Sequence, residues 1–164
     1  MKVIYPGSFD PITCGHVDII DRLTDLFQEI HVLVAHSRNK QTLFSLEERV
    51  SLIRKVFKNS AKVHIDSFAG LTTDYMKQKN IKMIVRGLRA VSDYEYELTM
   101  ANMNKKLYPE CETLFLQSSP HLTFVSSRGI KEVAYNNGSL DGLIPAEIQD
   151  DLNQQIRKSN AISR

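Results

Sequence analysis

Short runs of apolar residues alternate along the chain with longer runs in which apolar residues recur every three or four positions. The short runs have the length and composition of β-strands, and the longer runs have the spacing of amphipathic helices. The expected strands cover residues 2–5, 30–35, 62–68, 82–86 and 112–117. Because strands that alternate with helices pair in parallel through right-handed crossovers, the pattern predicts a five-stranded parallel sheet with helices on both faces.

The predicted fold class is therefore α/β, as a single Rossmann-like, doubly wound domain over residues 1–164. A chain of 164 residues with 42% hydrophobic residues is long enough to bury a substantial core. In sheets of this kind, ligands bind at the carboxyl ends of the strands, where the strand order reverses. We expect the functional residues to lie on loops at that edge.

Two helices carry signals of where they begin. Residues 45–48, Ser-Leu-Glu-Glu, have the form of a capping box, in which a serine and a glutamate satisfy each other's backbone N–H groups. Pro145 suits the first turn of a last helix because its φ is fixed. We expect that helix over about 145–158, and the polar tail 159–164 is expected to fray.

Charge and cysteine content narrow the functional class. Lys and Arg number 21 against 19 Asp and Glu, and both signs are interspersed, which argues against a nucleic-acid-binding surface. No apolar run reaches the roughly 18 residues of a membrane span, so we expect a cytoplasmic protein without a membrane partner. Cys14 and Cys111 lack C-x-x-C spacing. Both are expected to be reduced, and Cys14 to be a bystander rather than a nucleophile.

The most informative segment is the loop over residues 6–16, PGSFDPITCGH, which joins the first strand to the next helix. It offers the hydroxyls of Ser8 and Thr13, and it finishes with His16 at the N-terminal edge of that helix. Because backbone N–H groups at a helix N-terminus bind anions, the loop predicts a phosphate site with a titratable donor in it. Asp10, which precedes a proline, is expected to form a turn.

Polar side chains also follow the other strands of the predicted sheet. Together they are Ser8, His16, Lys40, Arg86, Arg89, Ser126 and Ser127. If they converge, they form an anion-lined cleft, because crowded guanidinium and ammonium groups repel one another unless anions lie between them. A plainer interpretation remains for three of these positions. Lys40 could be a solvated loop lysine, and the two arginines could form exposed ion pairs with the acidic residues that follow them.

Four sequence blocks resemble a known enzyme family. The ending of the first loop, Thr-Cys-Gly-His over 13–16, resembles the T-x-G-H signature of the nucleotidylyltransferase superfamily. RGLRAVSDYEYE over 86–97 resembles the phosphopantetheine adenylyltransferase family, and LEER over 46–49 and VSSRGIKEV over 125–133 are in register with it. The resemblance implies a magnesium-dependent homohexamer that converts ATP and 4'-phosphopantetheine to dephospho-coenzyme A and pyrophosphate, with coenzyme A as a possible feedback ligand.

The resemblance also implies roles for individual residues. His16, Lys40 and Arg89 are expected to be catalytic, with His16 stabilising the transition state at the α-phosphate. The expected ATP-binding residues are Ser8, Phe9, His16, Gly87, Leu88, Arg89, Glu97, Leu122, Thr123, Phe124, Val125, Ser126, Ser127 and Arg128. The expected phosphopantetheine-binding residues are Ser8, Lys40, Thr72 and Arg86.

Three of these positions need comment. Thr72 could equally be a plain helix N-cap. Glu97 is expected near adenosine or an arginine, because a carboxylate beside a triphosphate is repelled. Arg128 departs from the family, which usually has a hydroxyl residue there.

The proposed chemistry needs few protein groups. A phosphate monoester has a second pKa of about 6, so the attacking oxygen is already ionised at neutral pH and requires no strong base. The protein must orient the two reactants and stabilise charge on the α-phosphate and the leaving pyrophosphate. No covalent enzyme intermediate is needed. Because no Asp/Glu cluster has the spacing of a cation site, Mg²⁺ is expected to be carried mainly by ATP oxygens and water, with no protein side chain as metal ligand.

Two alternatives stay open. One is another nucleotidylyltransferase, acting on nicotinamide mononucleotide or using CTP, and the sequence over 86–97 argues against it. The other is a non-catalytic sensor of adenine nucleotide or coenzyme A. The presence of His16, Lys40 and Arg89 disfavours that option, whereas Arg128 leaves it open.

Overall fold

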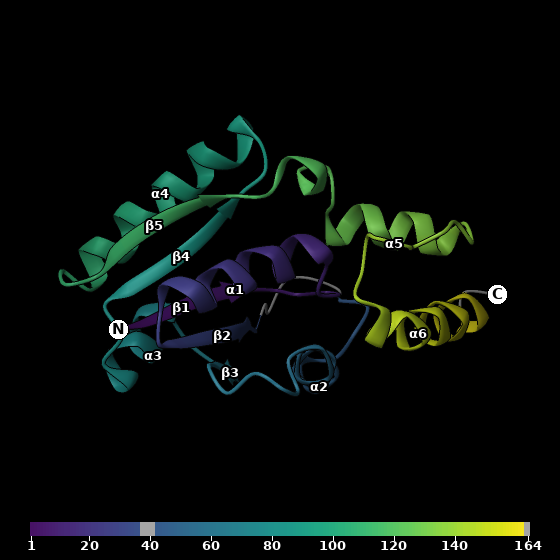
Figure 1. Ribbon diagram of the computed structural model, residues 1–164, viewed down its shortest axis with the longest axis horizontal. Helices are drawn as coiled ribbons and strands as arrows, with labels where there is room; N and C mark the ends of the chain where they lie inside the picture. Colours follow the sequence, from purple (N-terminus) through teal and green to yellow (C-terminus); the bar gives the residue numbers. More distant parts are fainter. Residues whose placement is uncertain (37–41, 163–164) are drawn as a thin grey trace.

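The computed structural model describes residues 1–36 and 42–162, and its centre is a five-stranded sheet in which every pairing is parallel. The strand order is β3-β2-β1-β4-β5, so the order reverses between β1 and β4 (Figure 1). The strands are β1 (Lys2–Gly7), β2 (Glu29–Ala35), β3 (Val63–Phe68), β4 (Met83–Leu88) and β5 (Glu112–Gln117). The predicted parallel sheet is confirmed, and each strand boundary lies within two residues of the expected one.

Helices cover both faces of this sheet. They are α1 (Cys14–Leu26), α2 (Leu46–Val56), α3 (Thr72–Lys79), α4 (Val91–Leu107), α5 (Ser127–Tyr135) and α6 (Gln149–Ile162), with 3₁₀ turns η1 (Pro120–Leu122) and η2 (Ala146–Ile148). Because successive residues of a strand point to opposite faces, Val3 and Tyr5 pack in one core with α1, α2, α5 and α6. Ile4 packs in a second core that includes Tyr75 and Met76 of α3.

The sheet opens between β1 and β4. β1 pairs with β2 at six positions, whereas its pairing with β4 is confined, in these fully described strands, to Ile4 opposite Ile84. Toward the carboxyl ends, the Arg86 side chain of β4 bridges the gap by donating to the Pro6 carbonyl at 2.8 Å. The separation leaves room for a ligand at the strand-order reversal, which is where open α/β sheets bind their ligands.

Two helices begin as local capping rules require. Ser45 Oγ accepts from the Glu48 N–H at 3.2 Å, and the Glu48 carboxylate accepts from the Ser45 N–H at 2.7 Å, which confirms the capping box. The first helix, α1, starts at Cys14 because the Thr13 side chain caps it. Within residues 1–36 and 42–162, no helix is both long and apolar enough to cross a bilayer.

The last helix begins and ends later than expected. Pro145 is not in its first turn: its ψ of 137° is extended, and it precedes η2, after which α6 begins. The expectation of a frayed tail is wrong for residues 159–162, which continue α6. The sequence there has no glycine or proline to stop the helix, and the Ser159 hydroxyl lies 3.4 Å from the Tyr135 hydroxyl of α5. Figure 1 shows α5 and α6 beyond the carboxyl ends of the strands.

Candidate active site

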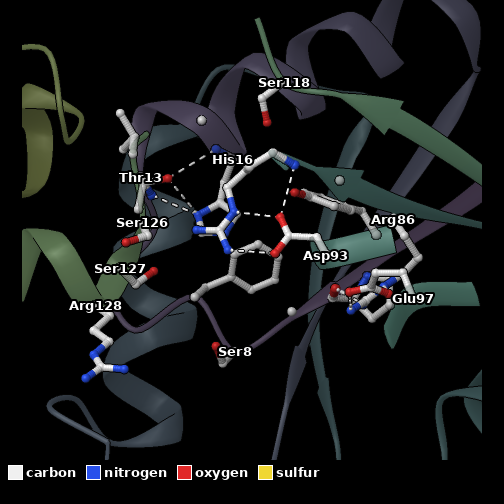
Figure 2. A pocket seen from close by; sticks show the side chains of 18 residues that line it. Ser8, Thr13, His16, Arg86, Asp93, Glu97, Ser118, Ser126, Ser127 and Arg128 are labelled. Carbon is white, nitrogen blue, oxygen red and sulfur yellow. Dashed lines mark hydrogen bonds and ion pairs between the residues drawn. The ribbon is translucent and has the colours of Figure 1, made fainter. Parts of the chain in front are cut away.

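A cleft of about 470 Å³ lies at the carboxyl ends of β1 and β4, where the sheet opens. Its walls come from the first loop, the start of α1, the end of β4, α4 and the start of α5, as Figure 2 shows. The lining residues are Tyr5, Pro6, Gly7, Ser8, Phe9, Thr13, Gly15, His16, Arg86, Gly87, Arg89, Asp93, Glu97, Ser118, Val125, Ser126, Ser127 and Arg128. Segments distant in sequence therefore meet at the predicted edge of the sheet.

The start of α1 fixes the tautomer of His16. The Thr13 backbone N–H donates to His16 Nδ1 at 3.1 Å, and the Thr13 hydroxyl lies 3.0 Å from the same nitrogen. In return, the Thr13 hydroxyl accepts from the His16 backbone N–H. Because a backbone N–H can only donate, Nδ1 must be unprotonated, and the neutral ring carries its proton on Nε2. His16 therefore presents an N–H donor on the ring atom that the cap leaves free.

The surroundings of His16 keep the ring uncharged. Burial, with a smaller contribution from the Arg89 guanidinium, lowers the pKa of His16 to about 4. The Phe9 ring packs edge-on against the imidazole, with ring centroids 5.0 Å apart, and Phe9 also contacts Tyr5. Gly7 makes room for this arrangement, because a Cβ there would lie 2.9 Å from the Phe9 ring. At neutral pH the group is a hydrogen-bond donor and not a cation.

Arg86 lies in the cleft as one half of an ion pair. Its Nε and Nη2 donate to the two Glu97 carboxylate oxygens at 2.6 and 2.7 Å, a bidentate contact between β4 and α4. The side chains are 25% and 12% exposed, so the pair is largely removed from water. Gly87 follows Arg86 in β4. A side chain there would place its Cβ 3.2 Å from the Tyr5 hydroxyl, so glycine allows β4 to pass close to Tyr5. Glu97 thus lies beside an arginine, as expected.

Arg89 is held in a similar way by Asp93, four residues further along the chain. The Asp93 carboxylate accepts from the Arg89 backbone N–H at 3.1 Å and from the guanidinium at 3.2 and 3.3 Å. Although burial alone would raise it, these hydrogen bonds hold the pKa of Asp93 below its usual value. The ion pairs of the plainer interpretation are therefore present, and they lie inside the cleft rather than away from it.

The start of α5 presents one arginine without such a counter-charge. The Ser126 hydroxyl accepts from the Gly129 N–H and caps the helix, and the Ser127 hydroxyl donates to the Pro11 carbonyl at 2.8 Å. Arg128 is exposed at the cleft and forms no ion pair with the residues that the structure describes. The two serine hydroxyls thus have intramolecular partners, whereas the Arg128 guanidinium is open to an anionic ligand.

Comparison with known proteins now identifies the family. The cytidylyltransferase-like family model matches residues 4–133. A phosphopantetheine adenylyltransferase of Bdellovibrio bacteriovorus is 56% identical over 155 residues, covering 94% of this chain and 97% of that protein. One from Dictyoglomus turgidum is 50% identical and covers 96% of this chain and 98% of that protein. The chain belongs to the phosphopantetheine adenylyltransferase family.

The family membership makes the chain a nucleotidyltransferase enzyme of coenzyme A biosynthesis. A solved structure supports the fold independently. Plasmodium falciparum nicotinic acid mononucleotide adenylyltransferase complexed with NaAD superposes with a TM-score of 0.65 at 19% identity, covering 97% of this chain and 95% of that chain. The Rossmann-like, five-stranded parallel architecture is thus shared with another nucleotidylyltransferase.

Most of the residues predicted from the sequence meet in the cleft, but some do not. Those that line it are Ser8, Phe9, His16, Arg86, Gly87, Arg89, Glu97, Val125, Ser126, Ser127 and Arg128. Lys40 falls in 37–41, outside the described residues. Leu88 lines an adjoining apolar groove with Arg89, Leu122 is buried in the core, and Phe124 is 73% exposed. Thr123 is half-buried, with its hydroxyl bonded to the Pro120 carbonyl.

Two of the simpler expectations need correction. Thr72 is the first residue of α3 and not its N-cap, which is Leu71 without a side-chain hydrogen bond. Asp10 is more than a turn residue, because it is 4% exposed and its carboxylate binds three partners on other segments. Burial raises the pKa of the Cys14 thiol, which favours its protonated form, and the bystander role of Cys14 stays a prediction.

Sequence reasoning missed several residues of the site. Thr13 was noted as a hydroxyl of the loop, but its role in fixing the His16 tautomer depends on the capping geometry. Asp93 lies four residues after Arg89 on the predicted helix, and this i,i+4 spacing is a signal that could have identified the pair. Ser118 and Tyr5 carried no such signal, because only the sheet order brings the ends of β5 and β1 to one cleft.

Proposed function

We propose that this protein transfers the adenylyl group of ATP to 4'-phosphopantetheine, giving dephospho-coenzyme A and pyrophosphate in a reversible, direct reaction. The observation that carries the proposal is the cleft itself. It brings the T-x-G-H start of α1, Arg86 of β4 with the following Arg89, and the start of α5 together at the strand-order reversal. Relatives named for this activity are 47 to 56% identical over more than nine-tenths of the chain.

His16 acts in this proposal as a transition-state stabiliser. Its Nε2–H donates to an oxygen of the α-phosphate, where negative charge grows as the acceptor phosphate attacks. A donor aimed at developing charge is worth about 3 kcal/mol of barrier. The neutral ring supplies this hydrogen bond without a proton transfer, which suits a reaction whose nucleophile is already ionised. Arg89 and Lys40 complete the catalytic set as cations beside the transferring group.

The acceptor phosphate is proposed to bind at the carboxyl ends of β1 and β4, together with residues that follow β2 and β3 in the sequence. Its residues are Ser8, Lys40, Thr72 and Arg86. Ser8 is exposed to the cleft, and Arg86 is already pre-oriented by Glu97 and by the Pro6 carbonyl. A phosphate that meets this arginine binds a guanidinium whose geometry is fixed, so little side-chain entropy is lost on binding.

The nucleotide binds along the other wall, between α1, β4 and α5. The proposed ATP residues are those predicted above, with the backbone N–H groups of the α5 start and the Arg128 guanidinium directed to the β- and γ-phosphates. Helix N-termini favour anions, and Arg128 lacks a counter-charge among the described residues. The guanidinium therefore replaces the hydroxyl that the family usually has at this position.

Magnesium is proposed to enter with ATP. Across residues 1–36 and 42–162, His, Cys, Asp and Glu side chains do not gather into a group of three that could hold a metal ion. The cleft carboxylates of Asp93 and Glu97 are bonded to arginines, so the donor set fits an ion held by phosphate oxygens and water. When bound, Mg²⁺ supplies positive charge that neutralises the triphosphate.

A homohexamer is proposed as the assembled form, with coenzyme A as a feedback ligand of the same cleft because it contains the product. The surface of α4 supports self-association. Its exposed apolar side chains are Val91, Tyr94, Tyr96, Leu98, Met103 and Leu107, and Val91 is 86% exposed. Large exposed apolar side chains gathered on one helix are typical of an interaction site.

The most informative assay offers three acceptors in parallel. Pyrophosphate release from ATP is measured with 4'-phosphopantetheine, nicotinamide mononucleotide and choline phosphate, and CTP replaces ATP in a matched series. We expect turnover only with ATP and 4'-phosphopantetheine. Turnover with another pair would replace the proposed substrates, and binding of adenine nucleotide without turnover would make the protein a sensor.

Replacing the histidine tests its role directly. His16→Ala should lower kcat by about 10²- to 10³-fold, because one aimed donor to the transition state is lost. His121→Ala is the matched control, since His121 is exposed in η1 outside the cleft lining. Circular dichroism establishes that both variants fold. Unchanged turnover in folded His16→Ala would remove His16 from the mechanism.

A further inference from the structure

Two buried charged side chains lie behind the first loop, outside the cleft lining. Arg49, the last residue of the LEER block in α2, is 3% exposed, and Asp10 in the first loop is 4% exposed. Burying an ionised group costs several kcal/mol unless hydrogen bonds compensate it. Neither residue was assigned a role in binding or catalysis above, so their contacts need a separate explanation.

Arg49 binds three main-chain carbonyls on three different segments. Its Nη1 donates to the Ser8 carbonyl at 2.6 Å and to the Ala35 carbonyl at 3.2 Å, and its Nε donates to the Ser45 carbonyl at 3.3 Å. Ser8 belongs to the first loop, Ala35 ends β2, and Ser45 is the N-cap of α2. One guanidinium thus joins the first loop, β2 and α2.

Asp10 makes the complementary connection through its negatively charged carboxylate. Its carboxylate accepts from the backbone N–H groups of Leu43 and Phe44, both at 3.0 Å, and from Lys131 of α5 at 2.8 Å. The backbone N–H groups of Leu43 and Phe44 therefore hold the segment before α2 to the first loop. Arg49 binds the carbonyls of Ala35 and Ser45, which lie before and after these two residues in the chain. Burial lowers the pKa of Arg49, and the nearby negative charge of Asp10 opposes this effect.

We propose that Arg49 is a positioning residue for the transfer reaction: it fixes the Ser8 segment relative to the end of β2 and so sets the affinity of the cleft for the acceptor phosphate. The inference rests on the proposed function, in which Ser8 binds that phosphate. The Ser8 side chain is exposed to the cleft while its carbonyl is held from behind. Asp10 supports the same arrangement from the other side of the β2–α2 connection.

The proposal predicts that a change at Arg49 weakens the binding of 4'-phosphopantetheine more than the binding of ATP. Ser8 lines the cleft and belongs to both proposed binding sets, but it is one of four phosphopantetheine residues and only one of fourteen ATP residues. His16 is held by the Thr13 cap, which Arg49 does not contact. Because a displacement of about 1 Å can cost a hundredfold in rate or binding, loosening the Ser8 segment should weaken acceptor binding while ATP binding changes little.

Lysine cannot reproduce the contacts of this arginine. The guanidinium reaches three carbonyls with two nitrogens in a rigid planar fork, whereas an ammonium is a single nitrogen on a flexible stem. Arg49→Lys therefore keeps the charge but loses the geometry. Arg49→Met keeps much of the apolar stem and loses both.

The experiment measures kcat and KM for each substrate in Arg49→Lys and Arg49→Met. Arg54→Met is the matched control, because Arg54 lies on the same helix, is exposed and donates to the Ile65 carbonyl of β3 at 3.4 Å. We expect KM for 4'-phosphopantetheine to rise about tenfold or more in Arg49→Lys. We expect KM for ATP to stay within about threefold, and Arg54→Met to match the parent protein.

Each outcome decides between positioning and a purely structural role. An equal fold-change of KM for the two substrates, relative to the parent protein, in a folded Arg49→Lys would overturn the proposal, whatever the melting temperature of the variant. Loss of folding in Arg49→Lys as well as Arg49→Met would also overturn it, because the residue would then serve the fold alone. If the parent protein does not use 4'-phosphopantetheine, the proposed function fails first, and the two failures are therefore distinguishable.

Discussion

At the scale of single residues, the chemistry of the cleft depends on which ring nitrogen of His16 carries the proton. The Thr13 backbone N–H donates a hydrogen bond to His16 Nδ1, so this nitrogen is unprotonated. The neutral imidazole therefore carries its proton on Nε2, which is the atom that can donate to a ligand. A histidine is commonly assigned as an acid or base, but this one is neutral at physiological pH because it is buried beside a cationic guanidinium. Its contribution is a directed hydrogen bond and not a transferred proton.

This assignment predicts a specific titration. In protein labelled with ¹⁵N at histidine, NMR should show the neutral Nε2–H form of His16 from pH 8 down to pH 5, with protonation at about pH 4. Because the unfolded chain binds this proton near pH 6.5, the stability associated with His16 should fall as the pH drops from 6.5 to 4. A titration midpoint near 6.5, or an Nδ1–H tautomer, would contradict the assignment.

At the scale of elements, much of the architecture could be predicted because strands and capped helices have local signals. The strand boundaries and the capping box at Ser45 were set by apolar runs and by a serine–glutamate spacing. The end of α6 could not be predicted in this way, because its last turns are stabilised partly by a contact with α5. Likewise the buried role of Asp10 depends on partners 33 and more residues away.

Several site residues came from local motifs, and others did not. The T-x-G-H block and the run over 86–97 identified His16, Arg86 and Arg89, since each follows directly from a short pattern. The Arg86–Glu97 pair follows from the packing of α4 against β4, whereas the Arg89–Asp93 pair has a local i,i+4 spacing. Predictions that fell on residues 37–41 lie outside the described residues.

The contact between α4 and β4 makes a prediction at this scale. Glu97→Gln should lower the free energy of unfolding by about 3 kcal/mol, because it leaves the largely buried Arg86 without its counter-charge. Glu95→Gln is the control, as Glu95 is exposed on the same helix, and its effect should stay within about 0.5 kcal/mol. Urea denaturation measures both. Equal effects of the two substitutions would show that the Arg86–Glu97 pair does not stabilise the fold.

At the scale of the whole molecule, the strand order explains why one cleft collects so many cations and donors. The reversal between β1 and β4 brings loops from both halves of the sheet to one edge, and α5 closes it from beyond the strands. Two of the three cleft arginines carry their own carboxylates, so the site is held together before a ligand arrives. Polyphosphate then meets oriented guanidinium groups at low cost in entropy.

The proposed assembly gives a prediction for the molecule in solution. Light scattering should give a mass of about six times the 18.7 kDa of one chain. Replacing Val91 and Tyr96 of α4 by aspartate should lower this mass if that apolar surface forms an interface between subunits, since a buried like charge is costly. A monomer mass for the unmodified protein would contradict the proposed hexamer.

The central claim is a single displacement, in which the acceptor phosphate attacks the α-phosphorus of ATP and no enzyme side chain is adenylylated. The most direct test uses ATP made chiral at the α-phosphorus with sulfur and oxygen isotopes. The configuration of that phosphorus in the product is then determined by NMR. We expect inversion of configuration, because a single in-line attack inverts the phosphorus. Retention would reveal two successive displacements through a covalent enzyme intermediate and would rule out direct transfer.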